Sequence, residues 1–276
     1  MSLYGIKGNN PRYSFDIEGV FPDSLYDVNG NALQDLIVMS FNIQRWSGIN
    51  ANTDIMNGIF DRYKPNIVGF QEHQPSKSFG GVPILQYLQG RWNYTAECST
   101  KINDYSKIAV SDFEYSEHET VYYENFAESR SYHRFYINFK GKRIAVINTH
   151  LDTTANQTKK VLQAKELFDA VAEEEYFIIL GDFNTICTSI SDSQYIEIMK
   201  QFVDAGYNCA NCSEQFGFLD TWTDGTSVND TWCQTDHVIT SSNISIDRVT
   251  VDRAKLQANT GLVIDHLPVV AYLSVN

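Results

Sequence analysis

The sequence lacks a membrane-spanning apolar run, and it has few cysteines, few prolines and too little positive charge to balance its acidic residues. No apolar stretch approaches the ~20 residues that a transmembrane helix needs. Five cysteines in 276 residues are too few for a disulfide scaffold, and 6 prolines with 16 glycines exclude collagen-like and low-complexity chains. The chain also begins without the basic-then-apolar pattern of a secretory signal. We therefore expect a soluble globular protein, and the sequence leaves its cellular location unknown.

Positive charge is scarce, because 21 lysines and arginines stand against 34 aspartates and glutamates and give a net charge of −13. Proteins that bind nucleic acid through bulk electrostatics are basic, since neutralising phosphates drives their binding. The charge balance therefore argues against processive or sequence-specific binding of DNA. It does not exclude a phosphate-bearing substrate, because bound divalent cations can supply positive charge locally.

The first 35 residues differ from the rest of the chain. Turn-forming residues recur within 1–35 at close intervals, as in Asn9-Asn10-Pro11 and Asn29-Gly30-Asn31. We interpret 1–35 as a turn-rich lead-in or the remnant of an upstream domain. Residues 36–276 are interpreted as one domain, which we expect to be monomeric.

Short apolar runs alternate with amphipathic segments from Leu36 onward. Runs of β-branched and aromatic residues predict strands, and apolar residues three and four positions apart predict helices. The predicted strands are 36–41, 66–70, 132–139, 143–148, 177–180, 238–240, 246–251 and 269–273, and the predicted helices are 54–63, 157–174 and 193–203. Many short strands with few helices between them indicate an α/β (α+β) fold in which two packed sheets are flanked by helices.

Six polar clusters border these apolar runs and form the candidate site. Five of them end a run and the last precedes one: Ser40-Phe41-Asn42, Gln71-Glu72, Asn148 to Asp152, Gly181 to Asn184, Asp265 to Pro268, and Thr235 to Val238. Because sites in α/β folds form where strands end, we expect the clusters to meet at one edge. Each cluster alone is weak evidence, since Asp182 and Asn184, for example, are also ordinary turn residues.

The side chains of these clusters suit hydrolysis of a phosphate ester. Carboxylate and amide oxygens are hard ligands, which favour Mg²⁺, Mn²⁺ or Ca²⁺ over zinc or copper. A divalent ion can neutralise phosphate oxygens while a base activates water and amides stabilise the developing charge. Two histidines of the clusters, His150 and His266, are available for acid–base chemistry.

The order of the clusters resembles the endonuclease/exonuclease/phosphatase superfamily, which has the DNase I-like fold. Ser-Phe-Asn-Ile at 40–43 and Gly-Phe-Gln-Glu at 69–72 are similar to its first two motifs. Asn-Thr-His-Leu-Asp at 148–152, Gly-Asp-Phe-Asn at 181–184 and Asp-His-Leu-Pro at 265–268 are similar to its later motifs. The resemblance covers nearly all of the chain after the lead-in, and it implies a four-layer α/β/β/α sandwich of two packed, mostly antiparallel sheets.

The resemblance also implies a metal site. Glu72 would be the principal ligand, with Asn42 beside it and Asp265 contributing to the same ion or to a second one. The implied ion is Mg²⁺ or Mn²⁺, with Ca²⁺ as an alternative.

The implied catalytic residues are His150, Asp182, Asn184, Asp236 and His266. Asp182 would orient or deprotonate the attacking water, and Asn184 would hold an oxygen of the substrate phosphate. His266 would contact the phosphate and would be held in its tautomer by Asp236, since a histidine bonded to a carboxylate has a raised pKa and a fixed ring. His150 would stabilise the pentavalent phosphorus from the other side.

Two further positions match the superfamily more loosely. Tyr105 and Arg130 stand where many members carry a tyrosine and an arginine that contact the substrate phosphate. A surface tyrosine and a solvated, ion-paired arginine are the alternative interpretations.

A separate pattern involves the cysteines. Cys209 and Cys212, with Cys233 and His237 downstream, could hold a structural zinc ion. Reduced thiols or one disulfide fit better, because the sequence holds a single Cys-x₂-Cys pair.

The predicted activity is that of a divalent-metal-dependent phosphoesterase, which hydrolyses a phosphodiester or phosphomonoester by in-line attack of water. A nuclease-type enzyme is the preferred interpretation. One alternative is a small-molecule or lipid phosphoesterase acting on inositol phosphates or sphingomyelin-like head groups, since a fold does not specify a substrate. Another is a non-catalytic module of a larger assembly, which the complete set of motif residues disfavours. The expected partner is the phosphate-ester substrate, either nucleic acid or a small molecule.

Overall fold

The computed structural model describes most of the chain. The described residues are 5–6, 14–15, 35–43, 53–73, 78–79, 81–98, 106–124, 130–153, 157–187, 189–213, 217–219, 221–223, 232–252 and 265–276. Three parts of the predicted lead-in 1–35 are among the described residues: strand β1 (Gly5–Ile6), strand β2 (Ser14–Phe15), which pairs with it, and Asp35. The rest of the lead-in lies outside the described residues. The division at residue 35 stays a prediction. None of the described helices is long and apolar enough to span a membrane.

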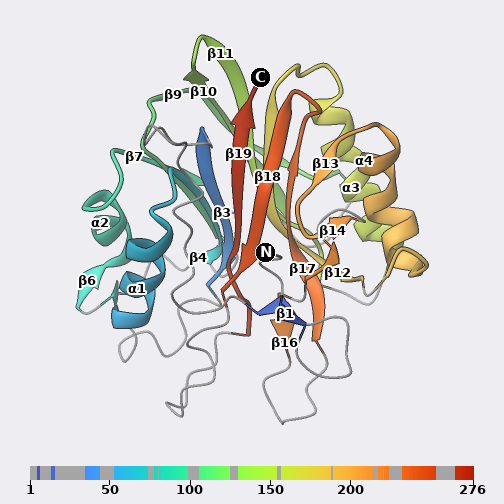
Figure 1. The fold of residues 1–276 in the computed structure, drawn as a ribbon. Coiled ribbons are helices and arrows are strands. Elements are labelled where there is room, and N and C mark those ends of the chain that lie inside the picture. Colours follow the sequence, from blue (N-terminus) through green and yellow to red (C-terminus); the bar gives the residue numbers. More distant parts are fainter. Residues whose placement is uncertain are drawn as a thin grey trace, which may run out of the picture.

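The first large sheet has six strands, and two helices cover its outer face (Figure 1). Its order is β18-β19-β3-β4-β8-β7, and among these described neighbours β3 and β4 alone run parallel. Helices α1 (Thr53–Tyr63) and α2 (Ile84–Gln89) pack against β3 and β4, and the short strands β5 (Ser78–Phe79) and β6 (Val82–Pro83) pair beside α2. The six strands are β3 (Leu36–Asn42), β4 (Ile67–His73), β7 (Tyr94–Cys98), β8 (Ser106–Ser111), β18 (Ile244–Val251) and β19 (Val269–Val275).

The second large sheet has the order β13-β17-β12-β11-β10-β9, with β16 added beside β17. Among its described neighbours, β11 and β12 alone run parallel. Its outer face is covered by α3 (Gln157–Val171), the π-helix η4 (Tyr195–Met199) and α4 (Lys200–Asp204). The strands are β9 (Tyr115–Tyr122), β10 (Ser131–Phe139), β11 (Lys142–His150), β12 (Phe177–Cys187), β13 (Asn208–Cys209), β16 (Trp222–Thr223) and β17 (Trp232–Thr240), and β14 (Cys212–Ser213) pairs separately with β15 (Gly217–Phe218).

The two sheets pack face to face, which confirms the predicted four-layer α/β/β/α sandwich. Buried apolar residues from both sheets, such as Val38 and Leu180, form the core between them. Residues two apart on a strand face the same side, so the inward face of β3 changes from Leu36 and Val38 to Ser40 and Asn42. The inward face of β12 likewise changes from Leu180 to Asp182. The layer between the sheets is therefore apolar at one end and polar at the other.

The predicted strands and the first two predicted helices are present, and α1 ends at Tyr63, two residues before Pro65. The third predicted helix, over 193–203, is formed as η4 followed by α4. Helix α2 and strands β7, β8 and β9 were not predicted from the sequence. In β9 the middle residues are exposed and polar, so the edge strand carries no alternating apolar signal.

Two strands at the polar end are longer than their apolar runs predicted. β12 continues to Cys187, and β17 begins at Trp232 rather than at 238, so Asp236 lies inside a strand and not at its start. The physical reason is that ladder hydrogen bonds are made by the backbone and continue through polar residues.

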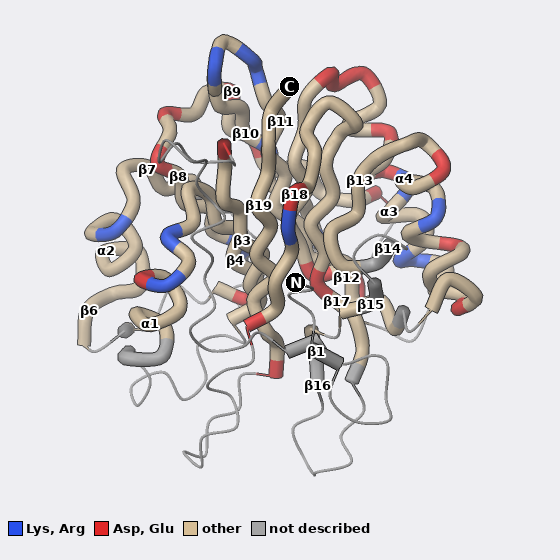
Figure 2. The backbone as a smooth tube through the Cα atoms, viewed as in Figure 1, with Lys and Arg blue, Asp and Glu red and all other residues tan. Residues whose placement is uncertain are grey.

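Charged residues of both signs are scattered over the outer helices and turns (Figure 2). In this view, no continuous band of lysine and arginine crosses the described part of the chain. The net charge of −13 is itself unfavourable for binding nucleic acid through bulk charge.

Two buried histidines should make the fold sensitive to acid. Burial, with the charges of His118 and Lys107, lowers the pKa of His133 to about 3, and burial lowers that of His237 to about 4. Their stabilising contribution is complete above the unfolded-state pKa of about 6.5 and is lost as the pH falls towards these lower values, because the unfolded chain binds the protons first.

We therefore expect the urea midpoint to fall between about pH 6.5 and pH 4, with unfolding coupled to the uptake of up to two protons by these side chains. In the double variant His133→Phe/His237→Gln, the urea midpoint should fall less across that pH range. Urea denaturation at a series of pH values measures this. An equal fall in the parent and the variant would contradict the assignment.

Candidate active site

Strand pairing brings the predicted polar clusters to one end of the sandwich. In the first sheet, parallel pairing places Asn42 opposite Gln71, next to Glu72. In the second sheet, Asp182 lies opposite both His150 and Asp236. The structure thus brings together Asn42, Glu72, His150, Asp182, Asn184, Asp236, Asp265 and His266, whereas Tyr105 lies outside the described residues.

Asn42 connects the two sheets at the centre of the site. Its amide nitrogen donates to Asp182 Oδ2 at 2.9 Å and lies 3.4 Å from Glu72 Oε1. Asn42 and Asp182 are buried, and Glu72 is half-buried. One amide therefore aligns two carboxylates that come from different sheets.

Two site residues adopt the left-handed backbone conformation. Glu72 has φ 56° and lies where the register of β4 on β8 shifts, and Asn184 has φ 50° and lies where that of β12 on β17 shifts. Such irregularities turn a side chain away from the regular alternation, and they are common next to active sites. Glu72 and Asn184 are therefore aimed by strand irregularities and not by the strand period alone.

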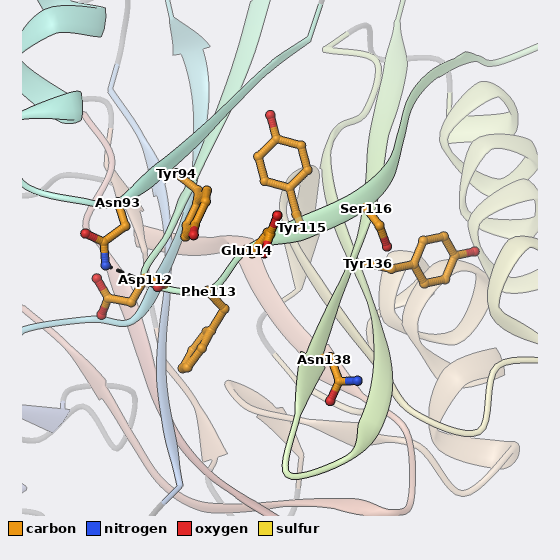
Figure 3. A pocket seen from close by; sticks show the side chains of 9 residues that line it. All are labelled: Asn93, Tyr94, Asp112, Phe113, Glu114, Tyr115, Ser116, Tyr136 and Asn138. Atoms are coloured by element: carbon orange, nitrogen blue, oxygen red, sulfur yellow. Dashed lines mark hydrogen bonds between the residues drawn. The ribbon is translucent and has the colours of Figure 1, made fainter.

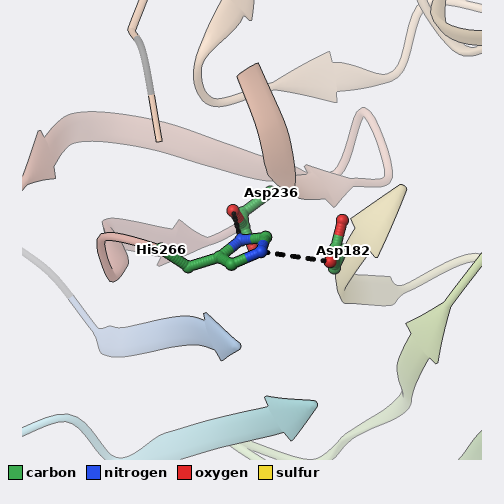
Figure 4. A group of neighbouring side chains, drawn as sticks. All are labelled: Asp182, Asp236 and His266. Carbon is green, nitrogen blue, oxygen red and sulfur yellow. Dashed lines mark hydrogen bonds and ion pairs between the residues drawn. The ribbon is translucent and has the colours of Figure 1, made fainter. Parts of the chain in front are cut away.

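His266 lies between two carboxylates (Figure 4). Its Nδ1 is 2.8 Å from Asp236 Oδ2, and its Nε2 is 3.7 Å from Asp182 Oδ2. Thr235 also donates to Asp236 Oδ2, at 2.9 Å. The ligand atoms of Asp182, Asp236 and His266 lie within 4.8 Å of one another, so this buried group could hold a metal ion.

The charges of this group favour a hydrogen-bonded imidazolium. Burial lowers the pKa of His266, but the negative charges of Asp236 and Asp182 outweigh burial and raise it above its usual value. Burial raises the pKa of Asp182, and the positive charge of His266 opposes that rise. A protonated histidine cannot be a metal ligand, because both ring nitrogens carry hydrogen.

His150 has the opposite electrostatic state. Its Nε2 lies 3.3 Å from Asp182 Oδ2. His150 comes from β11 and Asp236 from β17, which pair with β12 on its two opposite sides. Burial lowers its pKa well below the usual value, and the positive charges of Arg130, Lys107 and His266 lower it further. His150 is therefore a neutral imidazole.

Asn184 is fixed by its neighbours on both sides. Its backbone N–H donates to Asp182 Oδ1 at 2.8 Å, and its amide nitrogen donates to the carbonyl of Leu151 at 3.0 Å. The buried Lys160 of α3 donates to the Asn184 carbonyl at 2.5 Å. Because the amide nitrogen carries two hydrogens, the second remains for a substrate oxygen.

A pair of buried amides below the site was not assigned a role by the sequence analysis. Gln71 Nε2 donates to Asn148 Oδ1 at 2.7 Å, and Asn148 Nδ2 donates to the carbonyls of Phe70 and Ile108 at 3.0 and 3.1 Å. A Cβ atom at Gly69 would stand 2.9 Å from Asn148 Oδ1, so only glycine lets the sheets approach this closely. The signal was present in the sequence, since Gln71 and Asn148 belong to two of the polar clusters.

Thr221 is a second residue that the sequence analysis missed. Its hydroxyl oxygen accepts the N–H groups of Thr235 and Asp236, both at 3.0 Å. Its carbonyl accepts the N–H of Leu267 at 2.7 Å. Thr221, which directly precedes β16, therefore fixes both the strand that carries Asp236 and the residue that follows His266. No sequence pattern points to it, because the contact depends on tertiary structure.

The loosely matched Arg130 lies directly before β10, with 2% of its surface exposed, and its charge reaches His150. This position differs from the alternative of a solvated surface arginine. Cys209 and Cys233 are both buried. Within the described residues, the aspartate–histidine group above is the one group of potential metal ligands, and the side chain of Cys212, which belongs to the predicted zinc pattern, lies outside them.

A pocket of about 530 Å³ lies at the opposite end of the sandwich (Figure 3). It follows the end of β8 at Ser111, which pairs with Ile67 at the start of β4. Its lining residues are Asn93, Tyr94, Asp112, Phe113, Glu114, Tyr115, Ser116, Tyr136 and Asn138. None of the described site residues lines it, so this pocket is separate from the candidate active site.

Comparison with protein-family models finds no match, and no curated protein matches the sequence. Solved structures do match. Truncated Caenorhabditis elegans TDP2 is 17% identical, with a TM-score of 0.67 over 87% of this chain and 97% of that chain. D. rerio TDP2 complexed with single-strand DNA product is 17% identical, with a TM-score of 0.69 over 87% and 99%.

An endonuclease/exonuclease/phosphatase from Bacteroides vulgatus is 14% identical, with a TM-score of 0.64 over 87% of this chain and 99% of that chain. At such identities the likeness concerns the fold. This chain therefore has the DNase I-like fold of the endonuclease/exonuclease/phosphatase superfamily.

Proposed function

We propose that this chain is a divalent-metal-dependent phosphoesterase of the nuclease type, which hydrolyses a phosphodiester by in-line attack of water. The supporting observation is a continuous set of contacts that runs from Glu72 through Asn42 and Asp182 to His266 and Asp236. These contacts gather hard oxygen ligands, a base and an acid around one point, as a reaction at a single phosphate requires.

The acidic side of the site fits a divalent cation. Three of its carboxylates, those of Asp182, Asp236 and Asp265, lie 2.8 to 3.9 Å from the ring nitrogens of His266, and burial already raises the pKa of Asp182. Glu72 and Asp265 would hold the ion with Asn42 beside them, and these oxygen ligands favour Mg²⁺ or Mn²⁺. When bound, the ion would neutralise oxygens of the substrate phosphate.

The remaining residues would move protons and orient the phosphate. Asp182, with its raised pKa, is a general base for the attacking water. His266 would donate its Nε2 hydrogen to the phosphate, while Asp236 fixes the ring through Nδ1. Asn184 and the neutral His150 would donate to phosphate oxygens from the side opposite β17.

Two observations favour nucleic acid as the substrate class. The similar D. rerio TDP2 has been solved in complex with a single-strand DNA product. The net charge of −13 argues against holding a duplex through bulk charge, so the substrate would be held at the site itself. A short or single-stranded end suits this arrangement better than long duplex DNA.

The function is tested by a hydrolysis panel of single-stranded oligonucleotide, plasmid DNA, RNA, bis(p-nitrophenyl) phosphate, inositol phosphates and sphingomyelin. Each is assayed with Mg²⁺, Mn²⁺, Ca²⁺ or EDTA. We expect hydrolysis of single-stranded nucleic acid with Mg²⁺ or Mn²⁺, and none with EDTA, because the carboxylates alone would repel the phosphate. Hydrolysis confined to inositol phosphates or sphingomyelin would replace the nuclease-type proposal. Activity that persists in EDTA would exclude the metal.

Glu72→Gln removes one negative charge and keeps the shape of the side chain. We expect the Mg²⁺ concentration for half-maximal rate to rise by about tenfold or more, since a ligand is weakened, while the melting temperature changes little. Magnesium titration of the rate measures this. Glu117→Gln, at an exposed residue paired with Arg143, is the matched control and should behave as the parent. An unchanged magnesium dependence in Glu72→Gln would remove Glu72 from the metal site.

Asp236→Asn replaces the carboxylate that stabilises the imidazolium of His266. We expect the turnover rate to fall by roughly 10²–10⁴-fold, as when the aspartate of a catalytic triad is replaced by asparagine. Combining it with His266→Ala should cost scarcely more than His266→Ala alone, because the two act as one unit. A double-mutant cycle at saturating Mg²⁺ measures this, and Asp204→Asn on exposed α4 is the control. Additive losses would show that Asp236 and His266 act separately.

A further inference from the structure

Two cationic side chains are buried at the catalytic end of the sandwich. Lys107 of β8 has 1% of its surface exposed, and Arg130 before β10 has 2%. Both charges reach His150, where they lower the pKa of the imidazole. The carboxylates of the site come instead from β4, β12, β17 and Asp265. The site therefore has an acidic side and a basic side, inside a protein whose net charge is −13.

His133 extends the basic side along β10. It faces inward with Phe135 and Ile137, and its side chain is fully buried. The charge of Lys107 acts on it, and the ring of His118 packs against it at a centroid distance of 4.3 Å. Within the described part of the chain, neither nitrogen of His133 has a hydrogen-bond partner. Buried polar groups nearly always have one, so this imidazole indicates a polar ligand.

The position of His133 relates it to the reacting centre. It pairs with Asn148, which lies two residues before His150 on β11, and β10 is the strand beyond β11 as seen from Asp182. His133 therefore lies one strand, about 5 Å, to the side of His150 and two residues, about 7 Å, further from the end of β11 at which His150 lies opposite Asp182. A ligand at His133 would lie beside the phosphate that His150 contacts and not in its place.

We propose that Lys107 and His133 form a second anion subsite, which binds a non-reacting phosphate group of the same substrate. The proposal rests on the proposed function and names the substrate class: a nucleotide-type diester with a further phosphate on the adjoining sugar. The Lys107 ammonium would donate to that phosphate, and the neutral His133 would donate one N–H. Charge-assisted bonds of this kind bind phosphate strongly when they are buried.

Binding of inorganic phosphate in EDTA tests the subsite without the reaction. In the absence of metal the carboxylates repel phosphate, so binding measured by titration calorimetry would come from the basic side. We expect the parent protein to bind phosphate, and Lys107→Met and His133→Phe each to weaken binding by about tenfold or more. Lys165→Met, which removes an exposed lysine paired with Asp169, should bind as the parent does.

A substrate pair supplies the second readout. Thymidylyl-thymidine has one phosphate, and its 5′-phosphorylated form has two. We expect kcat/KM to be higher for the phosphorylated form by about tenfold, and Lys107→Met and His133→Phe each to abolish that preference, so that each variant hydrolyses the two substrates with equal kcat/KM. Inositol bisphosphate, assayed in parallel, distinguishes a neighbouring phosphate on a nucleotide from one on another polyol.

The outcomes separate this inference from the proposed function. If the parent hydrolyses the single-phosphate substrate but shows neither phosphate binding in EDTA nor the preference, the subsite is refuted and the phosphoesterase stands. If phosphate binds in EDTA but no ester is hydrolysed with any metal, the proposed function is refuted and the anion subsite stands. Phosphate binding that both Lys107→Met and His133→Phe retain would also refute the subsite. Should Lys107→Met fail to fold, His133→Phe carries both measurements.

Discussion

The amide of Asn148 crosses from the seven-stranded sheet to the six-stranded sheet and hydrogen-bonds Gln71 and two backbone carbonyls there. At the other end of the sandwich, apolar side chains hold the sheets together. At the polar end, buried positions of β3, β4 and β12 carry polar side chains such as Ser40, Gln71 and Asp182 instead. Buried amides replace apolar packing, and Gly69 provides the close approach that they require. The contact between Asn42 and Asp182 depends on this spacing.

This arrangement explains why the site tolerates so many buried charges. A buried charge is costly unless it has a partner, and here each carboxylate lies beside an amide or an imidazolium. The network extends outward through Thr221, whose hydroxyl fixes the backbone of Asp236 and whose carbonyl fixes Leu267. His266 is therefore held from both sides, by the ring contact to Asp236 and by its own chain.

Most of the fold could be predicted from the sequence, because apolar periodicity reports directly on buried faces. The strands that flank α3, for example, are marked by continuous apolar runs such as 177–180. The edge strand β9 could not be predicted, since its exposed polar residues lack that periodicity. The motifs predicted which residues belong to the candidate site. They did not predict the direction in which the side chains point. Glu72 and Asn184 face the site through a left-handed backbone at register shifts, and such shifts arise from pairing between distant strands.

Three histidines at this end of the sandwich show how neighbours, and not residue type, set the charge. Burial lowers the pKa of each of them, but His266 lies between two carboxylates and is raised above its usual value. His150 and His133 lie near Lys107 and are lowered further. A phosphate bound among them would meet a charged donor beside Asp182 and neutral donors on the side of β10. In the proposed reaction, the charged donor would give up a proton and the neutral donors would hold oxygens in place. The acidic side of the site would then carry proton transfer, and the basic side would carry binding.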